Sequence, residues 1–376
     1  MELSCLQENL KQGLFVAGHI AGRNLNLPIL NNVMIEAKGG DIKIVTTNLE
    51  IGITCGIRGK IEKDGSFTVD SKVFTDYINL LPNKKVSMIR SENNLKIVCD
   101  SYRTKIRGQS SEEFPLIPAV GRSVCYRAEA SEFKRALSQV IFAVSPGESR
   151  MELAGVFFGF NQGKLILAAT DSYRLAEKEL KIKNENNSDQ NIIIPAKTLQ
   201  EVIRILSGAR DGGAEGEGGQ EINFYISENQ ILFTVKSTEV VSRLIEGQYP
   251  DYKQIIPKSN KTSALVDRAG LIRAVKASSL FSKTGINDIN LDFPQNKNQV
   301  VVSSASGQTG ESVTSLEASV KGEDNGIVVN YHYLLDGLNN IEGENVKIEI
   351  IDNNTPCVLR PEKEKDYLYI VMPIKQ

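Results

Sequence analysis

The chain has 376 residues, which is longer than one hydrophobic core usually grows, so we expect two or three domains. Lys and Arg total 44 and Asp and Glu total 46, which gives a formal net charge of −2 and a pI near 6.0. This balance excludes a protein that is basic throughout, so any nucleic-acid partner would need basic residues gathered on one face.

Five cysteines are scattered along the chain, and none forms a Cys-x-x-Cys pair. This spacing argues against a disulfide framework and a structural zinc site, and it predicts reduced, mostly buried thiols. The first residues lack a basic flank before an apolar core, and no apolar run approaches the ~20 residues of a membrane span. We therefore expect a soluble, cytoplasmic protein.

In chain order, a helical pattern of apolar residues comes first and then recurs twice. It covers residues 8–21 (ENLKQGLFVAGHIA), 131–144 (SEFKRALSQVIFAV) and 269–282 (AGLIRAVKASSLFS). Two strand-like runs joined by a turn follow each helix: VMIEA with DIKIVTT, VFFGF with KLILAAT, and INLDF with QVVVSSA.

A second, shorter helix follows in each third of the chain, at residues 70–81, 195–206 and 330–341. Further antiparallel pairs come next, such as KVSMIR with LKIVCD and EINFYI with QILFTV. The same order of helix, hairpin, helix and hairpin in three thirds predicts three homologous domains, which we place at residues 1–121, 127–255 and 258–376. The expected fold class is α+β, with two helices packed on antiparallel sheet in each domain. The acidic, glycine-rich insert at 211–220 (DGGAEGEGGQ) is predicted to be a solvated loop, and we assign it no role.

Basic residues recur on the polar sides of these helices. If the helices share one side of the molecule, such residues would form a positive lining that contacts phosphates without sequence preference. Solvation of an ordinary helix face explains each of them equally well. The candidates are Lys11, Arg23, Lys72, Lys134, Arg135, Lys197, Arg204, Arg273 and Lys276.

The stretch ATDSYRLA at residues 169–176 places Thr, Asp and Ser beside an aromatic ring and an arginine where a strand ends. Such a group suits binding better than catalysis, although a common Asp-Ser turn is the simpler interpretation. This stretch also belongs to a set of segments that resembles a known family. The others are LPILNNVMIEA at 27–37, FAVSPGESRMELAGV at 142–156, EGQYPDYKQIIP at 246–257, ENVKIEI at 344–350 and VMPIKQ at 371–376.

In order and spacing, these segments resemble the bacterial DNA polymerase III β subunits, the sliding clamps, over essentially the whole chain. The resemblance implies three clamp domains per chain and two chains that close head to tail into a ring around duplex DNA. It implies a non-catalytic processivity factor that needs no cofactor or metal and binds no membrane. The implied partners are the replicative polymerase, the clamp loader, repair polymerases and mismatch-repair proteins.

The resemblance also implies a groove between the second and third domains that binds short linear peptides. An apolar floor of Leu, Val, Met and Pro would suit such a peptide, with Met372 and Leu175 contributing most and Arg174 helping to orient it. The matching residues are Leu153, Thr170, Ser172, Tyr173, Arg174, Leu175, Pro250, Ile255, Asn330, Tyr333, Ile370, Val371, Met372 and Pro373. Ser172-Tyr173 replaces a Gly-His, and Lys375-Gln376 replaces a basic-then-apolar ending, so the preference for partners is open.

For DNA, the resemblance adds Arg150 and the loop 145–149 to Arg23, Lys72 and Lys197; we also keep Lys134 and Arg204. For the contact between subunits it points to the predicted edge at 101–109, with Arg103, Lys105 and Arg107, and to the strand at 312–321 with Leu280 and Phe281. A protected edge without a partner is the alternative for each strand.

A hydrolase or nucleotide-processing enzyme on a repeated fold is the alternative function. The sequence contains no His-x-x-x-His pair, no Gly-x-x-x-x-Gly-Lys-Ser/Thr loop and no Gly-x-Ser-x-Gly, and its two histidines, His19 and His332, are far apart. No catalytic residue is therefore predicted. A duplicate clamp with altered partners is a variant of the first interpretation.

Overall fold

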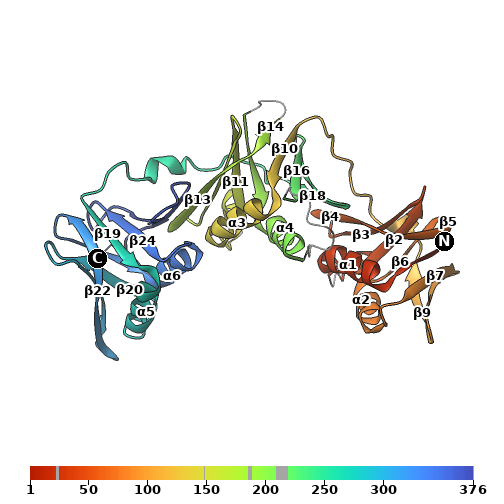
Figure 1. Ribbon diagram of the computed structural model, residues 1–376, viewed down its shortest axis with the longest axis horizontal. Helices are drawn as coiled ribbons and strands as arrows, with labels where there is room; N and C mark the ends of the chain where they lie inside the picture. Colours follow the sequence, from red (N-terminus) through yellow and green to blue (C-terminus); the bar gives the residue numbers. More distant parts are fainter. Residues whose placement is uncertain (23–24, 148, 185–188, 209–218, 376) are drawn as a thin grey trace. The chain divides into compact units, whose positions relative to one another are not determined.

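The computed structural model describes residues 1–22, 25–147, 149–184, 189–208 and 219–375 (Figure 1). They divide into two compact units. Unit 1 comprises Met1–Ser131, Lys183–Asn186 and Gln200–Leu244, and unit 2 comprises Glu132–Ile182, Asn187–Leu199 and Ile245–Gln376. The predicted loop at 211–220 lies, except for its last two residues, outside the described residues.

The described residues form six α-helices and 26 strands. The first third contains β1 (Glu2–Leu6), α1 (Gln7–Ala17), β2 (Asn32–Lys38), β3 (Asp41–Thr47), β4 (Ile51–Ile57), β5 (Gly59–Lys63), β6 (Gly65–Asp70), α2 (Ser71–Leu80), β7 (Lys85–Ser91), β8 (Asn94–Cys99) and β9 (Tyr102–Gln109). The middle third contains β10 (Cys125–Glu129), α3 (Ala130–Val140), β11 (Gly155–Asn161), β12 (Lys164–Thr170), β13 (Arg174–Lys181), β14 (Lys183–Asn184), β15 (Gln190–Pro195), α4 (Ala196–Gly208), β16 (Glu221–Ile226), β17 (Gln230–Val235) and β18 (Thr238–Arg243). The last third contains β19 (Thr262–Asp267), α5 (Arg268–Ser279), β20 (Asp288–Phe293), β21 (Gln299–Ser306), β22 (Gly310–Gly322), β23 (Asn325–Asn330), α6 (Tyr331–Asn340), β24 (Asn345–Ile350), β25 (Cys357–Pro361) and β26 (Tyr367–Val371).

The recurrence seen in the sequence is confirmed. Each third has a helix, a hairpin, a second helix and another hairpin: β2–β3 and β7–β8, then β11–β12 and β16–β17, then β20–β21 and β24–β25. Polar side chains cap the start of three helices. Asp70 accepts from the amide of Val73, and Asp267 and Asn330 play the same part for α5 and α6.

The strands form one sheet in each unit. In unit 1 the order is β14-β10-β16-β17-β18-β4-β3-β2-β6-β9-β8-β7-β1-β5, and in unit 2 it is β15-β11-β12-β13-β26-β25-β24-β19-β22-β21-β20-β23. Sheet pairing therefore crosses from one repeat to the next twice, through β18 with β4 and through β13 with β26. Both junctions are held by main-chain hydrogen bonds as well as side-chain packing.

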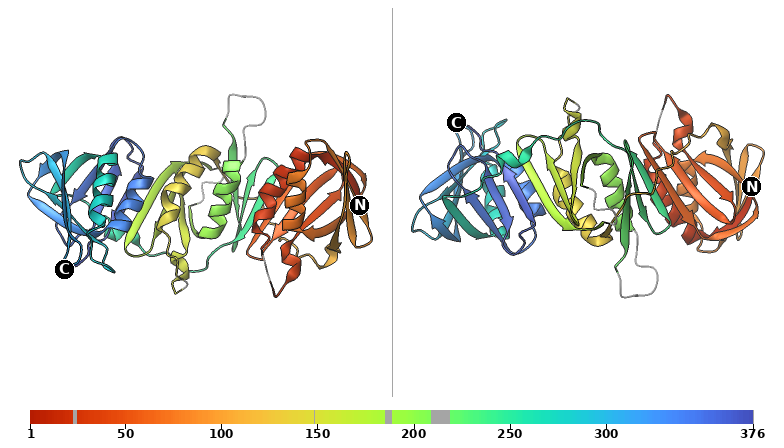
Figure 2. Two further views of the ribbon diagram at one scale, coloured as in Figure 1. Left: turned by 90° about the horizontal axis from the view of Figure 1, so that it is seen from below. Right: turned by 90° about the horizontal axis from the view of Figure 1, so that it is seen from above.

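The helices bury their apolar stripes against the strands. In unit 1, α1 and α2 lie side by side (Figure 1), and Leu10, Leu14, Phe74 and Ile78 are almost completely buried. In unit 2, α5 and α6 form an equivalent pair beside their strands, shown in teal and blue in Figure 2. This agrees with the predicted layers of helix on antiparallel sheet.

All five cysteines are free and buried, as predicted from their spacing. No helix in the described part of the chain has the length and apolar character needed to cross a membrane. Among the same residues, no three His, Cys, Asp or Glu side chains gather closely enough to hold a metal ion.

Candidate functional site

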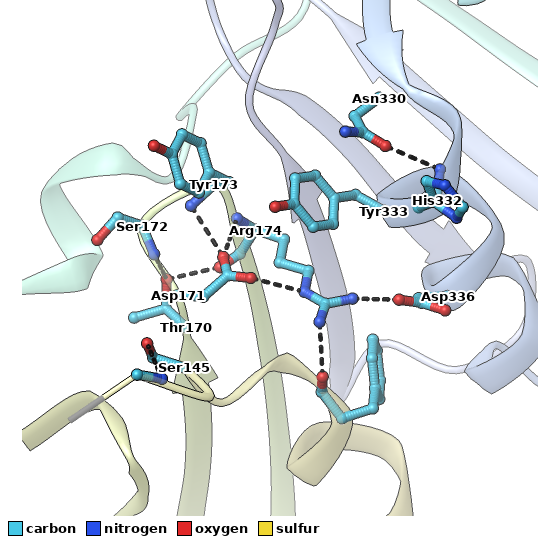
Figure 3. Close-up of polar contacts among 12 residues, drawn as sticks. Ser145, Thr170, Asp171, Ser172, Tyr173, Arg174, Asn330, His332, Tyr333 and Asp336 are labelled. Carbon is cyan, nitrogen blue, oxygen red and sulfur yellow. Dashed lines mark hydrogen bonds and ion pairs between the residues drawn. The ribbon is translucent and has the colours of Figure 1, made fainter. Parts of the chain in front are cut away.

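The stretch at 169–176 forms a hairpin turn in unit 2. Strand β12 ends at Thr170 and β13 begins at Arg174, with Asp171 between them. The Asp171 carboxylate accepts from the amides of Tyr173 and Arg174 at 2.9 and 3.0 Å, and the amide of Ser172 donates to Thr170 Oγ1 at 3.1 Å (Figure 3). Ser172 has a φ of 79°, a left-handed conformation that is uncommon for a residue with a side chain. Side-chain hydrogen bonds therefore hold this turn in one shape.

Arg174 occupies the centre of the site and is only 11% exposed. Its Nε donates to Asp171 at 3.1 Å, Nη1 donates to Asp336 on α6, and Nη2 donates to the carbonyl oxygen of Phe142 at 2.9 Å (Figure 3). Burial works to lower the pKa of Arg174, but Tyr369 and the two carboxylates outweigh it and raise the pKa. The guanidinium therefore stays charged, with each of its nitrogens in use.

Two tyrosine rings stack beside this guanidinium. Tyr173 and Tyr333 have ring centroids 6.1 Å apart and an interplanar angle of 13°, and the Arg174 guanidinium lies 4.9 Å from the centroid of Tyr333. Tyr173 is 62% exposed, whereas its carbonyl oxygen accepts from the amide of Met372 at 2.9 Å. The ring of Tyr173 is thus accessible, while a hydrogen bond fixes its main chain.

A buried apolar cluster lies behind the turn, and the backbone of the C-terminal segment passes next to it. The cluster includes Leu153, Leu175 and Ile370, with Tyr249 and Tyr252 from the segment that follows β18. The hydroxyl of Tyr252 donates to Glu177 at 2.6 Å, and burial, reinforced by this carboxylate, raises the pKa of Tyr252. That bond ties the segment containing Pro250 to β13.

The structure brings most of the predicted peptide-binding residues into one part of unit 2. Val371 pairs with Arg174, Pro373 bridges to Val329, and Asn330 caps the helix that carries Tyr333. The accessible surface comes chiefly from Ser172, Tyr173 and Ile255, with partial exposure of Pro250, Tyr333, Met372 and Pro373. Leu175 is fully buried, so its expected weight as a direct anchor is not supported in this conformation; it forms the floor beneath the exposed residues.

Two residues of this site were missed from the sequence, Phe142 and Asp336. Asp336 follows Tyr333 by three residues on α6, a spacing that puts both side chains on one face of the helix. That spacing was the available signal. Phe142 belongs to the segment 142–156, but it contacts Arg174 through its backbone carbonyl as well as its ring, and the residue type does not reveal a carbonyl contact.

The predicted basic residues differ in their exposure to solvent and in their side-chain partners. Lys72 is strongly exposed, with Asp76 3.1 Å away; Lys197 is exposed; Lys134 is partly exposed; and Arg150 is half exposed, with contacts to Glu152 and Ser172. Arg23 lies outside the described residues, as does part of the loop 145–149.

Arg204 differs from the others. Its guanidinium donates to Glu201 at 2.9 Å and to the carbonyl oxygens of Phe15 and Val16 at 2.6 and 2.7 Å, and it lies over the ring of Phe15. These contacts join α4 to the end of α1 within unit 1. Arg204 therefore braces two helices, and these contacts do not favour the predicted role in DNA binding.

The two predicted subunit edges are strands with an open side within the described residues. From Tyr102 to Arg107, β9 pairs with β8 only, and its last two residues also pair with β6. The 310–317 part of β22 pairs with β21 only, before the strand continues beside β19. Val313 and Leu280 are exposed apolar residues on and near β22, and Tyr102 is an exposed aromatic residue on β9.

Comparison with known proteins gives matches along the whole chain. Family models described as the N-terminal, central and C-terminal domains of the DNA polymerase III beta subunit match residues 1–118, 128–251 and 253–375. The chain is 28% identical to beta sliding clamps of Staphylococcus epidermidis and Staphylococcus aureus over 359 residues, or 93% of this chain and 92% of those proteins.

Solved structures agree in fold. The DNA polymerase III beta subunit of Thermotoga maritima has a TM-score of 0.90 at 26% identity, and the DNA polymerase sliding clamp of Bacillus subtilis has a TM-score of 0.92 at 25% identity. Each comparison covers 100% of this chain and 99% of the other.

Proposed function

The chain belongs to the DNA polymerase III beta subunit family, and from this premise we propose that two copies close head to tail into a ring around duplex DNA. Members of this family are sliding clamps, non-catalytic factors that make a DNA polymerase processive. The observation that carries the proposal is the match of all three domain models, in order, across residues 1–375. A clamp that acts on the bacterial chromosome would work in the cytoplasm.

The surface around Tyr173 is the proposed docking site for partner peptides. An extended segment of the replicative polymerase, the clamp loader, a repair polymerase or a mismatch-repair protein would lie over exposed Tyr173 and Ile255 and partly exposed Met372. The adaptable thioether of Met372 and the apolar floor beneath it would bury the partner's hydrophobic side chains. A few such anchors supply most of the affinity of a peptide site.

Duplex DNA would be held by exposed lysines on the helices, without readout of bases. Lys72, Lys134 and Lys197, with Arg150, are the described residues that we propose for phosphate contacts, and Arg23 is a further candidate. Each phosphate contact contributes about −0.9 to the slope of log affinity against log salt concentration. Weak contacts of this kind let a protein slide along DNA.

The open edges suit a contact between two copies of the chain. Arg103, Lys105 and Arg107 give β9 a positive edge, whereas Glu311 and Glu317 give β22 a negative one. Opposite charges on facing edges select the heterologous pairing and oppose β9 pairing with another β9. Leu280 and Phe281 would add apolar area beside β22.

The test combines size in solution with retention on DNA. Sedimentation should give a dimer, and the loaded protein should stay longer on nicked circular DNA than on the same DNA made linear, because a ring slides off free ends. A stable monomer at micromolar concentration, or equal retention on both DNA forms, would refute the ring. Turnover of nucleotides or DNA by the purified chain would refute a non-catalytic role.

A further inference from the structure

Helix α6 approaches the 170–174 turn with two side chains from one face, Tyr333 and Asp336. The ring of Tyr333 lies against the guanidinium of Arg174, and the carboxylate of Asp336 pairs with Nη1 of the same group (Figure 3). Arg174 therefore contacts α6 of the last repeat as well as Asp171 of its own turn.

The contacts of Arg174 hold its guanidinium in one place. A carboxylate, a second carboxylate and a main-chain carbonyl each accept from a different nitrogen, and aromatic rings of Tyr333 and Phe142 lie over it at 4.9 and 5.6 Å. These contacts use three of the five N–H groups of a guanidinium, one on each nitrogen, and loss of one contact would leave a buried or half-buried acceptor without its donor, which is unfavourable. Arg174 is thus fixed in position and supports the side chains that contact it.

The contacts of Arg174 with Tyr333, and of Tyr333 with Tyr173, connect the position of the guanidinium to the exposed surface. Tyr333 contacts both groups: its ring stacks with the exposed ring of Tyr173, and the guanidinium lies over it. Since three acceptors hold the guanidinium, it gives the Tyr333 ring a fixed contact. Tyr333 in turn supports Tyr173, the most exposed ring of the proposed docking site.

We infer that Asp336 is a positioning residue for peptide binding: it holds Arg174 beneath Tyr333 and so keeps the Tyr333–Tyr173 stack in place as a wall of the docking site. This inference rests on the proposed peptide-binding function. Asp336 is not one of the residues that the sequence predicted to contact the peptide. Asp336 acts on the partner through Arg174 and the two rings.

The matched control is Glu342, which lies just beyond α6 in the same unit. Its carboxylate is 47% exposed, as is that of Asp336, and it pairs with Arg135 of the middle repeat at 3.1 Å. The two carboxylates are alike in exposure and both join the last repeat to the middle one. They differ because Arg135 belongs to a surface network with Glu364, whereas Arg174 supports the aromatic stack.

The experiment measures binding of a fluorescein-labelled peptide that carries the clamp-binding segment of a bacterial replicative polymerase. Asp336→Asn should weaken binding about three- to tenfold, the effect of losing one charge-assisted hydrogen bond at a half-exposed site, mostly through faster dissociation. Glu342→Gln should bind like the wild type, and Asp336→Glu should recover much of the affinity. Hydrogen exchange of the Met372 amide, which donates to Tyr173, should speed up in Asp336→Asn only.

The outcomes separate this inference from the proposed function. A wild-type chain that binds no peptide would overturn both. A wild-type chain that binds, together with Asp336→Asn that binds equally well, would overturn the positioning role alone. Equal losses in Asp336→Asn and Glu342→Gln would also overturn it, because the effect would then be general stability of the contact between repeats.

Discussion

Replacement of Gly337 by alanine tests the packing of α6, the helix that carries Tyr333 and Asp336. Gly337 is buried against Tyr369, and a Cβ added at this position would lie 2.2 Å from two ring carbons of that tyrosine. Tyr369 has no exposed surface, and its hydroxyl donates to the carbonyl oxygen of Tyr333 at 2.8 Å. The ring is thus held at its edge by the core and at its tip by the helix it contacts.

Two opposing effects decide whether Gly337→Ala raises or lowers the free energy of unfolding. Alanine in place of glycine inside an exposed helix would stabilise by about 0.8–1 kcal/mol. Overpacking of a core costs about 1–3 kcal/mol, and 2.2 Å is so far below the ordinary carbon–carbon contact of about 3.5–4.0 Å that the upper end applies. We therefore expect Gly337→Ala to lower the free energy of unfolding by about 2 kcal/mol.

Calorimetry and peptide binding together measure this effect. The transition that includes α6 should shift down by about 4–8 °C, and labelled peptide should bind more weakly because Tyr333 moves with the helix. Asn339→Ala, at an exposed position of the same helix, should melt at or slightly above the wild-type temperature. If Gly337→Ala melted as high as the wild type, the close packing of Gly337 on Tyr369 would be refuted.

Further predictions concern the C-terminus, the thiols and the subunit edge. Deletion of residues 371–376 should abolish polymerase stimulation and leave the dimer intact; loss of the dimer instead would mean that the docking site is misplaced. Burial raises the pKa of Cys5 and Cys357 to about 12 from the ordinary 9.0, so native protein at pH 8 should react slowly with a thiol reagent and unfolded protein should react at all five cysteines. Between pH 9 and 12 only the unfolded state loses these protons, so the free energy of unfolding should fall by up to about 1.4 kcal/mol per pH unit for each thiol, and an increase over this range would contradict the burial of both. Leu280→Asp should convert the dimer to monomer in sedimentation, whereas the strongly exposed Leu116 of the linker should tolerate the same change; a dimeric Leu280→Asp would exclude this residue from the contact.

The repeats were predictable because apolar periodicity and turn residues are local signals. Helices α1 to α6 all fall where their stripes of apolar residues indicated, and capping residues such as Asp70 and Asn330 stand at the expected starts. The boundaries at 1–121, 127–255 and 258–376 stay predictions. The two compact units divide the middle repeat between them, a property of spatial contacts that periodicity does not carry.

Strand β13 shows why part of the site was not predictable. Its segment RLAEKELK carries several charged residues, yet Lys178 is almost fully buried and pairs with Glu364 and Asp366 at 3.2 and 3.0 Å. A lysine is predicted to lie on the surface, because the carboxylates that allow its burial are distant in the sequence. Arg174 and Arg204 follow the same pattern: the resemblance suggested that Arg174 faces a peptide, and the helix pattern suggested that Arg204 faces DNA. Each guanidinium has long-range partners within the chain.

The pairing of β18 with β4 and of β13 with β26 has a mechanical consequence. Bending the chain at either junction would rupture a row of hydrogen bonds together, because paired strands share load along their length. In the proposed ring, each seam would join two separate chains, whereas the junctions within a chain are also linked by the covalent backbone. A loader that opens the ring would therefore separate the two chains at a seam. The repeats of each chain would stay paired with one another while the ring opens and closes.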